Sequence, residues 1–356
     1  MKVVITCGGT GGHIYPALSL ADALKETEGA DILFIGTPNH MEARIIPEHG
    51  YAFESVEAKG FNGGLLAKVS AFLLMMKQTR TAMTILKKYQ PDIVVGFGGY
   101  VSAPVIQAAH KLHIKTVLHE QNAFAGKANL YLERFSDAVV AVYDNVKKQF
   151  KGNVHLLGNP RTYTALHHKS DVTKETYGLT KDKPMVLFVM GSQGSESVNA
   201  LMKNILKKLG GRDYEVLYVT GEAHKDEFVP SEYPENVHFT SYVDQVALLP
   251  NTDLIVTRGG ATTAAEISVF GTPAIIIPSP YVPNNHQEIN ALALVKSGAA
   301  FLKREKELEE NDFIATLDAL MKDPERRQKM SEAAKSVSYP NSATDIIQLM
   351  KDLLHE

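Results

Sequence analysis

Three glycine-rich stretches of the chain have the composition of loops that bind phosphate groups. They read CGGTGGH at residues 7–13, MGSQGS at 190–195 and TRGGATT at 257–263. Each follows an apolar run typical of a buried strand and precedes a helical pattern. The free N–H groups at a helix N-terminus attract anions, and glycine lets the backbone approach a phosphate closely. Tight turns would explain one such loop equally well, but three in this position favour a diphosphate site.

Two ionisable side chains at these loops have the chemistry of a transfer reaction. His13 ends the first loop at a helix N-terminus, whose dipole favours the neutral imidazole, and neutral imidazole accepts protons from hydroxyl groups. A histidine that binds phosphate or caps the helix is the alternative. Glu266 lies one turn inside the helix after the third loop, where its carboxylate could accept both hydroxyls of a ribose. A glutamate that only favours the helix dipole is the alternative there.

The sequence lacks the common dinucleotide, ATP and metal motifs. The first loop does not fit G-x-G-x-x-G, because Ile14 stands where the third glycine is required. No G-x-x-x-x-G-K-[ST] or H-E-x-x-H pattern occurs. We therefore expect no NAD, no metal and no other cofactor. Arg161 and Arg258 are the candidate cations for stabilising a phosphate leaving group.

Size and composition narrow the class of protein. The 356 residues exceed the roughly 250–300 at which single cores stop growing, so two domains are expected. The net charge of -3 gives no sign of nucleic-acid binding. The single cysteine, Cys7, excludes an internal disulfide and fits a reducing cytoplasm; we interpret it as a packed small residue. We see neither a signal peptide nor an apolar run of about 18 residues that would span a membrane.

Strand and helix patterns alternate along the chain. Near-continuous apolar runs at 2–6, 30–36, 92–97, 114–120 and 137–142 predict buried parallel strands, with helices between them at 15–25 and 105–112. Pro16 is expected in the first turn of its helix. The theme restarts at 183–197, and PDIVVGFGGYVSAP echoes TDLIVTRGGATTAAE. We predict two Rossmann-like, doubly wound parallel-sheet domains at 1–160 and 161–340, followed by a C-terminal helix within 341–356 that packs back on the N-terminal domain.

Seven motifs resemble those of the MurG family of glycosyltransferases. They are GGTGGHIYPAL, GFGGYVSAP, HEQNAFAGKAN, GNPRT, MGSQGS, TRGGATTAAEI and NNHQEINA, in this order between Gly8 and Asn290. The resemblance implies the GT-B fold, with two Rossmann-like domains facing a cleft. It implies inverting transfer of GlcNAc from UDP-GlcNAc to the MurNAc 4-hydroxyl of lipid I, which gives lipid II in peptidoglycan biosynthesis. The implied partners are UDP-GlcNAc, lipid I and other cell-wall synthesis proteins, with no nucleic acid.

The resemblance also implies roles for individual residues. His13 matches the histidine suspected of deprotonating the acceptor hydroxyl, and Gln287 with His286 matches the pair that holds the GlcNAc. Better-known members carry glutamine at the position of His286. The acceptor side comprises Thr10, Gly11, Gly12 and Asn122. The donor side comprises Arg161, Ser192, Val243, whose backbone reads the uracil, and Ala261, Thr262, Thr263 and Glu266, which hold the diphosphate and ribose.

A lipid-linked acceptor requires a surface that meets the membrane. The candidate lies at residues 62–89, where apolar residues recur at helical spacing beside cations, as expected for an interfacial helix on anionic lipid. The apolar members are Leu65, Val69, Phe72, Leu73 and Met76, and the cations are Lys68, Lys77 and Arg80. An ordinary helix packed on the core is the alternative. We expect a cytoplasmic protein bound peripherally to the inner face of the cell membrane.

Two other classes of function stay open at this point. One is another GT-B enzyme, such as a diacylglycerol glucosyltransferase or a UDP-GlcNAc 2-epimerase. The other is a UDP-sugar-binding scaffold that has lost catalysis. The HEQN and NHQ motifs argue against the first, and His13, Glu266 and the glycine loops argue against the second.

Overall fold

The chain forms two compact units. The computed structural model describes residues 1–60, 63–191 and 194–356. The first unit comprises Met1–Thr164 together with Tyr339–Glu356, and the second comprises Ala165–Ser338. The first crossing between the units therefore lies at residues 164–165, where the sequence suggested 160–161.

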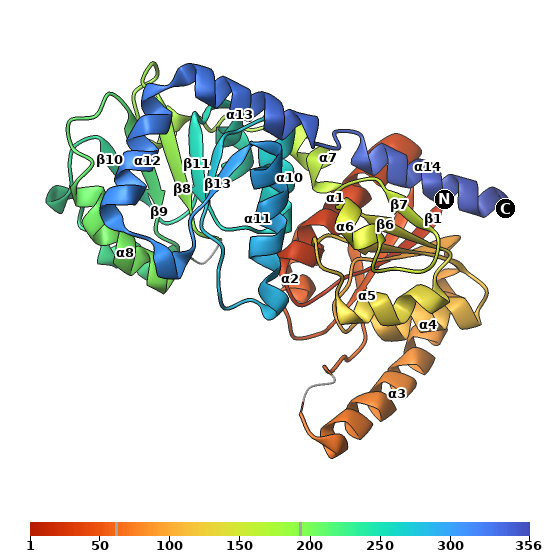
Figure 1. Cartoon of the computed structure of the whole chain (residues 1–356). Helices are drawn as coiled ribbons and strands as arrows, with labels where there is room; N and C mark the ends of the chain where they lie inside the picture. Colours follow the sequence, from red (N-terminus) through yellow and green to blue (C-terminus); the bar gives the residue numbers. More distant parts are fainter. Residues whose placement is uncertain (61–62, 192–193) are drawn as a thin grey trace. The chain divides into compact units, whose positions relative to one another are not determined.

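The described residues of the first unit form a seven-stranded parallel sheet in the order β3-β2-β1-β4-β5-β6-β7 (Figure 1). Its strands are β1 (Lys2–Thr6), β2 (Asp31–Gly36), β3 (Ala52–Ser55), β4 (Ile93–Gly96), β5 (Lys115–Glu120), β6 (Ala138–Ala141) and β7 (Val154–Leu156). Its helices are α1 (Gly11–Glu28), α2 (Glu42–Glu48), α3 (Leu65–Tyr89), α4 (Ser102–Lys111), α5 (Lys127–Leu132), α6 (Asp144–Lys147) and α14 (Ser342–His355), and α7 (Arg161–His167) crosses the boundary between the units.

Alternate residues of β1 serve two different cores. Val3 and Ile5 pack in the cluster that includes α1 and α14, whereas Val4 packs with residues of α3 and α4. Side chains alternate between the faces of a strand, so a sheet covered on both faces requires apolar residues at consecutive positions. This requirement explains the near-continuous apolar runs seen in the sequence.

Helix α1 begins earlier than the sequence suggested. It starts at Gly11 instead of residue 15, and the N–H groups of His13 and Ile14 both point to the carbonyl of Thr10, at 3.0 and 3.2 Å. Pro16 therefore lies in the second turn, which corrects its expected place in the first. The first turn is made by Gly11, Gly12 and His13, so the imidazole projects from the very start of the helix.

The second unit repeats the architecture. Its described residues form a six-stranded parallel sheet in the order β10-β9-β8-β11-β12-β13. The strands are β8 (Met185–Val189), β9 (Glu215–Val219), β10 (Val237–Thr240), β11 (Leu254–Thr257), β12 (Ala274–Ile276) and β13 (Ala300–Leu302). The helices are α8 (Glu196–Lys207), α9 (Gln245–Leu248), α10 (Ala261–Phe270), α11 (His286–Ser297), α12 (Glu310–Lys322) and α13 (Pro324–Ser336).

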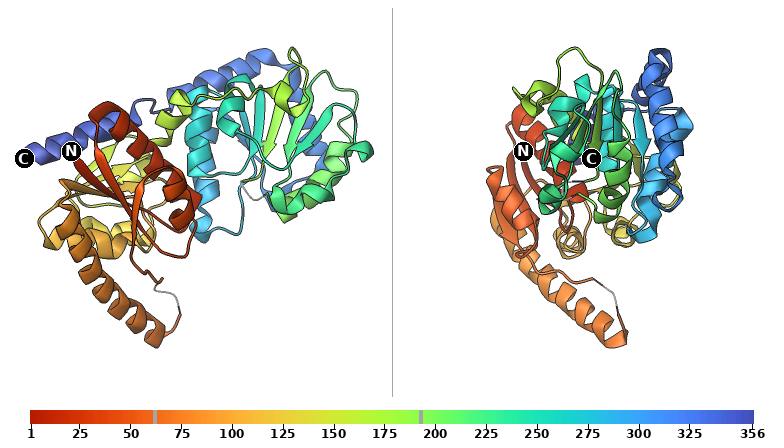
Figure 2. Two further views of the ribbon diagram at one scale, coloured as in Figure 1. Left: turned by 180° about the vertical axis from the view of Figure 1, so that it is seen from behind. Right: turned by 90° about the vertical axis from the view of Figure 1, so that its left-hand side faces the viewer.

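Two helices of the first unit stand out in the views. Helix α14 runs beside α1 and inserts Ile346, Ile347 and Met350 into the core, although it follows the whole second unit in sequence (Figure 1 and Figure 2). The N-terminal end of α3 extends away from the rest of the first unit in every view. The C-terminal part of α3 is anchored by buried residues such as Ala82 and Leu86.

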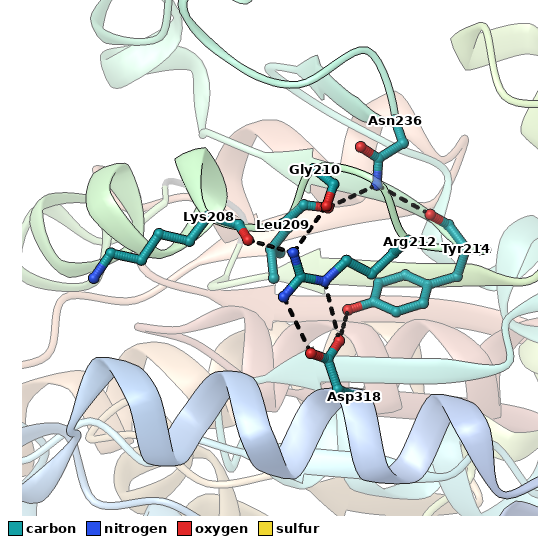
Figure 3. Close-up of polar contacts among 7 residues, drawn as sticks. All are labelled: Lys208, Leu209, Gly210, Arg212, Tyr214, Asn236 and Asp318. Atoms are coloured by element: carbon teal, nitrogen blue, oxygen red, sulfur yellow. Dashed lines mark hydrogen bonds and ion pairs between the residues drawn. The ribbon is translucent and has the colours of Figure 1, made fainter.

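A polar cluster fixes α12 to the end of α8 in the second unit (Figure 3). The carboxylate of Asp318 accepts hydrogen bonds from Arg212 Nε and Nη2, at 3.3 and 3.1 Å, and from the Tyr214 hydroxyl at 2.7 Å. Arg212 Nη1 also donates to the carbonyls of Lys208 and Gly210, which follow α8. Burial alone would raise the pKa of Asp318, but the hydrogen bonds from Arg212 and Tyr214 outweigh it and hold that pKa below its usual range.

We predict that Asp318→Asn lowers the free energy of unfolding of the second unit by roughly 1–3 kcal/mol at pH 7, because an amide cannot accept all three hydrogen bonds. The contribution of a carboxylate with a lowered pKa is present above its unfolded pKa of about 3.9 and is lost as the pH falls through the folded value. The difference from wild type should therefore narrow below about pH 4. Urea unfolding at several pH values measures it.

Asp312→Asn is the matched control, because Asp312 lies on the same helix and its ion pair with Lys303 leaves it 64% exposed. Exposed pairs contribute about 1 kcal/mol or less. Equal losses in the two variants would contradict the role given to Asp318.

Candidate active site

The predicted site residues gather where the strand order of each sheet reverses. The order turns between β1 and β4 in the first unit and between β8 and β11 in the second. Ligands of open α/β sheets bind beside the carboxyl ends of the strands at such points. The loop after β1 and the start of α1 carry Thr10, Gly11, Gly12 and His13, and Asn122 follows β5. The second unit carries Val243, Ala261, Thr262, Thr263, Glu266, His286 and Gln287, while the predicted donor residue Ser192 lies outside the described residues.

Two glycine loops of the first unit touch each other. A Cβ atom on Gly99, in the loop after β4, would lie 2.6 Å from the carbonyl oxygen of Gly8. One on Gly98 would lie 3.1 Å from His13 Nε2. Both glycines have positive φ angles, of 95° at Gly98 and 82° at Gly99. Only glycine combines these angles with so close an approach, so the GFGGY motif shapes the surroundings of His13.

The hydrogen bonds of His13 determine which ring nitrogen carries the proton. Nδ1 lies 2.9 Å from the carbonyl oxygen of Gly8 and 3.3 Å from the Thr10 hydroxyl. A carbonyl can only accept, so Nδ1 must donate, and in the neutral ring the lone pair then resides on Nε2. Nε2 is the basic nitrogen of this arrangement.

A buried carboxylate that the sequence analysis missed lies beneath the first glycine loop. Glu42, at the start of α2, is fully buried, and its Oε2 accepts from the N–H of Gly9 at 3.1 Å. Its Oε1 accepts from the N–H and the hydroxyl of Thr37, at 3.2 and 2.5 Å. The first loop is therefore not a simple phosphate cradle, because one of its N–H groups is used by Glu42. In sequence, Glu42 looks like any glutamate in the first turn of a helix.

The same carboxylate bears on Cys7. The thiol is fully buried, and burial together with the charge of Glu42 raises its pKa far above the usual range. A thiol that stays protonated is not a nucleophile, in agreement with the interpretation of Cys7 as a packed small residue.

The HEQN segment is organised by its own buried glutamate. Glu120 accepts from the backbone N–H groups of Asn122 and Gly126, at 3.1 and 2.8 Å, and from the side chain of Asn129 at 2.9 Å. These bonds fold the loop after β5 around the carboxylate and hold Asn122 at its surface. Neighbouring His119 donates from Nε2 to the carbonyl of Gly158, and burial lowers its pKa to about 4, so it is neutral at physiological pH.

In the second unit, the third glycine loop meets the NHQ segment. A Cβ atom on Gly259 would collide with the backbone carbonyl of Gln287, and the Asn290 side chain donates to the carbonyl of Gly259 at 3.1 Å. These contacts bring the N-terminus of α10 against that of α11. The Oε1 atom of Gln287 accepts from the N–H of Ser279 at 2.8 Å, which leaves its amide NH₂ as the half that can donate elsewhere.

Glu266 and Val243 are held by residues that the sequence analysis did not assign. Glu266 is only 4% exposed, and the Gln245 side chain donates to its Oε2 at 2.6 Å. The turn that carries Val243 is held by Asp244, which pairs with His168 at 2.7 Å. Burial would raise the pKa of Asp244, but hydrogen bonds led by that from His168 keep it below its usual range.

The two candidate cations are placed differently from the expectation. Arg258 is buried and forms an ion pair with Glu305 at 2.5 Å, while its Nη2 donates to the Ser195 hydroxyl at 2.6 Å. Its charge is thus already compensated, and it holds the second glycine loop. Arg161 belongs to the first unit, where its guanidinium lies 5.5 Å from the centre of the Tyr15 ring.

The predicted docking residues on α3 are largely exposed. Leu65, Phe72 and Leu73 are 79%, 49% and 62% exposed, and Leu66, which the sequence analysis did not include, reaches 87%. Val69, Lys68, Lys77 and Arg80 are also exposed, whereas Met76 is half-buried. The exposed apolar residues cluster on the end of the helix that extends from the unit.

The described ranges contain no group of histidine, cysteine and acidic residues able to hold a metal ion. Within those same ranges, no helix is long and apolar enough to cross a membrane.

Comparisons with known proteins cover the whole chain. Residues 3–141 match the N-terminal domain of glycosyltransferase family 28, and residues 185–350 match its C-terminal domain. A protein of Listeria welshimeri is 39% identical over 99% of this chain and 100% of its own length. One of Lactiplantibacillus plantarum is 38% identical over the same shares. Both are called UDP-N-acetylglucosamine–N-acetylmuramyl-(pentapeptide) pyrophosphoryl-undecaprenol N-acetylglucosamine transferase. The crystal structure of Acinetobacter baumannii MurG superimposes with a TM-score of 0.79 at 26% identity, over 99% of each chain.

We predict that Gly99→Ala destabilises the first unit by at least roughly 1 kcal/mol more than Gly50→Ala does. Both glycines have positive φ angles, which cost an alanine about 1–2 kcal/mol. A Cβ on Gly50 meets nothing within 4 Å, whereas one on Gly99 strikes the Gly8 carbonyl. Urea unfolding followed by tyrosine fluorescence compares the two, because the chain has no tryptophan. Equal losses would mean that the contact between the loops carries no strain.

Proposed function

The chain belongs to glycosyltransferase family 28, and from this premise we infer that it transfers N-acetylglucosamine from UDP-GlcNAc to lipid I to give lipid II. The observation that carries this conclusion is the full-length identity of 38–39% with relatives named for that reaction. The resemblance to the MurG family and the GT-B fold are confirmed by the family match and by the structure of Acinetobacter baumannii MurG. The protein is thus a glycosyltransferase of peptidoglycan biosynthesis.

The reaction exchanges one bond at the sugar's anomeric carbon. The 4-hydroxyl oxygen of MurNAc forms a bond to that carbon from the face opposite UDP, so the configuration inverts. The bond from the anomeric carbon to the diphosphate oxygen breaks, and its electron pair leaves with UDP. The hydroxyl proton needs an acceptor, and negative charge on the diphosphate needs stabilisation.

The proton acceptor that we propose is Nε2 of His13. Its support is the contact of Nδ1 with the Gly8 carbonyl, which directs the lone pair of the neutral ring to Nε2. Thr10, Gly11, Gly12 and Asn122 line the same edge of the first sheet and are proposed to bind the acceptor. The neutral state of His119 keeps a second positive charge away from the imidazole.

The donor site that we propose is built on α10 and α11. The N-terminal N–H groups at Ala261, Thr262 and Thr263 face the diphosphate, since a helix N-terminus stabilises negative charge. Glu266, oriented by Gln245, accepts from the ribose hydroxyls. The backbone at Val243 reads the uracil. Gln287 donates its NH₂ group to the GlcNAc, with His286 beside it. Ser192 and Arg161 complete the proposed donor contacts.

The membrane-facing surface that we propose is the exposed end of α3, comprising Leu65, Leu66, Val69, Phe72 and Leu73 with Lys68, Lys77 and Arg80. Its support is the exposure of large apolar side chains beside cations, a combination that favours the interface of an anionic membrane. A lipid-linked acceptor would be presented there, on the inner face of the cell membrane.

The transfer of labelled GlcNAc from UDP-GlcNAc to a lipid I analogue tests the function. We expect label in the lipid fraction only when donor and acceptor are both present, and little with UDP-glucose. Transfer to diacylglycerol, or donor binding without any transfer, would overturn the proposed reaction in favour of another lipid glycosyltransferase or an inactive scaffold.

The site variants separate the two halves of the proposal. His13→Ala should lower kcat by roughly 10²–10⁴-fold, which is the usual contribution of a general base, with little change in KM for UDP-GlcNAc. Glu266→Gln should raise that KM about tenfold, since one hydrogen bond to a charged group is lost. Near-normal turnover of His13→Ala would remove the histidine from the role of base.

Membrane binding is predicted to depend on both parts of the α3 surface. The Leu65→Ser, Leu73→Ser double variant should co-sediment with phosphatidylglycerol vesicles at least roughly tenfold more weakly, because it loses buried apolar area. Binding of the wild type should weaken in high salt, which screens the cations. Val229→Ser is the matched control, since Val229 is 49% exposed in the second unit. Binding that ignores salt and lipid charge would contradict the electrostatic part.

A further inference from the structure

One peptide unit connects the buried carboxylate to the proposed base. The N–H of Gly9 and the carbonyl of Gly8 belong to the same peptide group. Glu42 Oε2 accepts from the N–H at 3.1 Å, and His13 Nδ1 contacts the carbonyl oxygen at 2.9 Å. The two groups of a trans peptide point in opposite directions, so the carboxylate and the imidazole lie at its two ends.

We propose that Glu42 is a positioning residue for His13 and acts through the Gly8–Gly9 peptide. This inference rests on the proposed function, in which His13 is the base. The carboxylate orients the peptide plane and thereby aims the Gly8 carbonyl at Nδ1. The chain of groups has the logic of a carboxylate that supports a histidine base, with a peptide inserted between the two.

Two physical effects follow from this chain of hydrogen bonds. A negative charge at the N–H end polarises the peptide toward its oxygen, which makes the carbonyl a better acceptor for Nδ1–H. The same polarisation stabilises the imidazolium that forms when Nε2 takes the proton. Both effects are strong in a site without water, and the carboxylate of Glu42 is fully buried.

The surroundings leave the carboxylate little freedom. A Cβ atom on Gly8 would lie 2.5 Å from Glu42 Oε1, and one on Gly36 would lie 2.8 Å from its Cγ. Glycine at both places lets the side chain enter beneath the loop. Thr37 then occupies Oε1 with two hydrogen bonds, which turns Oε2 toward Gly9. The carboxylate is thus held from one side and presented to the peptide from the other.

Two further titratable groups bear on His13, and neither replaces Glu42. His119 is electrostatically coupled to His13 but is neutral at physiological pH, with a pKa of about 4. Glu120 is linked to the region through Asn129, which lies near Gly98 as His13 does. Its carboxylate is already surrounded by the N–H groups of its own loop.

Kinetics of Glu42→Gln test the proposal. We expect kcat to fall roughly 10- to 100-fold, as for other residues that orient an active histidine, with KM for UDP-GlcNAc within about twofold of wild type. The acid limb of the pH–kcat profile should move to lower pH, because loss of the negative charge disfavours the imidazolium. A purely structural role would instead lower stability and leave that limb in place.

Two controls isolate the carboxylate. Glu48→Gln makes the same change on α2, but Glu48 is exposed and pairs with Arg44 at the surface, so kinetics should match wild type. Thr37→Val removes a hydrogen bond from Oε1 while keeping the contact with Gly9, so it should change stability more than the pH profile. Normal kcat in folded Glu42→Gln, or an equal shift in Thr37→Val, would overturn the proposal.

A measurement on the wild-type protein covers the case in which Glu42→Gln does not fold. Nitrogen-15 NMR of labelled histidine, with the His13 signal assigned from its loss in His13→Gln, reports the tautomer directly. We expect the proton on Nδ1. A proton on Nε2 would overturn the inference. The result does not depend on turnover, so a failure of the proposed function and a failure of this inference are distinguishable.

Discussion

A carboxylate without access to water has to be hydrogen-bonded, because an unpaired buried charge would cost several kcal/mol. Glu42 is such a group, and the first site is arranged around its needs. Its donors come from the loop after β1 and from Thr37 after β2, so the ends of two strands must meet at one side chain. Once Gly9 is held there, the Gly8 carbonyl has one direction, and His13 takes its orientation from that carbonyl. The glycine loop is therefore shaped from below as well as from the ligand's side.

The second unit solves a similar problem with a charge of opposite sign. Arg258 is buried, compensated by Glu305, and donates to Ser195 beside the second glycine loop. The buried ion pair fixes the loops after β8 and β11 and leaves the N-terminus of α10 to meet an anion. The two units thus share an architecture in which glycines give shape, buried charges hold that shape, and helix N-termini provide the polarity. They differ in the residue that the loop presents, which is a base in one unit and backbone N–H groups in the other.

Much of this could be predicted from sequence, and the exceptions have a common physical cause. Strand–helix alternation and the glycine loops are local patterns, so the two sheets and the position of His13 followed directly from them. Glu42 and Arg258 were misjudged because burial is decided by partners far along the chain. Gly9 is 33 residues from Glu42, and Glu305 is 47 residues from Arg258. A helix-opening glutamate and a strand-ending arginine have no sequence signal that distinguishes a buried group from an exposed one. The start of α1 was missed for a related reason, since Gly11 and Gly12 have low intrinsic helix propensity and become helical only in this loop.

The return of α14 to the first unit has a consequence for how the chain is made. Ala343, Ile346, Ile347, Met350 and Leu353 complete a core that otherwise consists of residues before 165. During synthesis, the ribosome releases the strands and helices of the first unit long before it releases this helix. The face of the sheet that α14 covers must wait, apolar and open, while the whole second unit is translated and can fold. The first unit is begun first and finished last, so this waiting face is where a newly made chain has the greatest need of a chaperone.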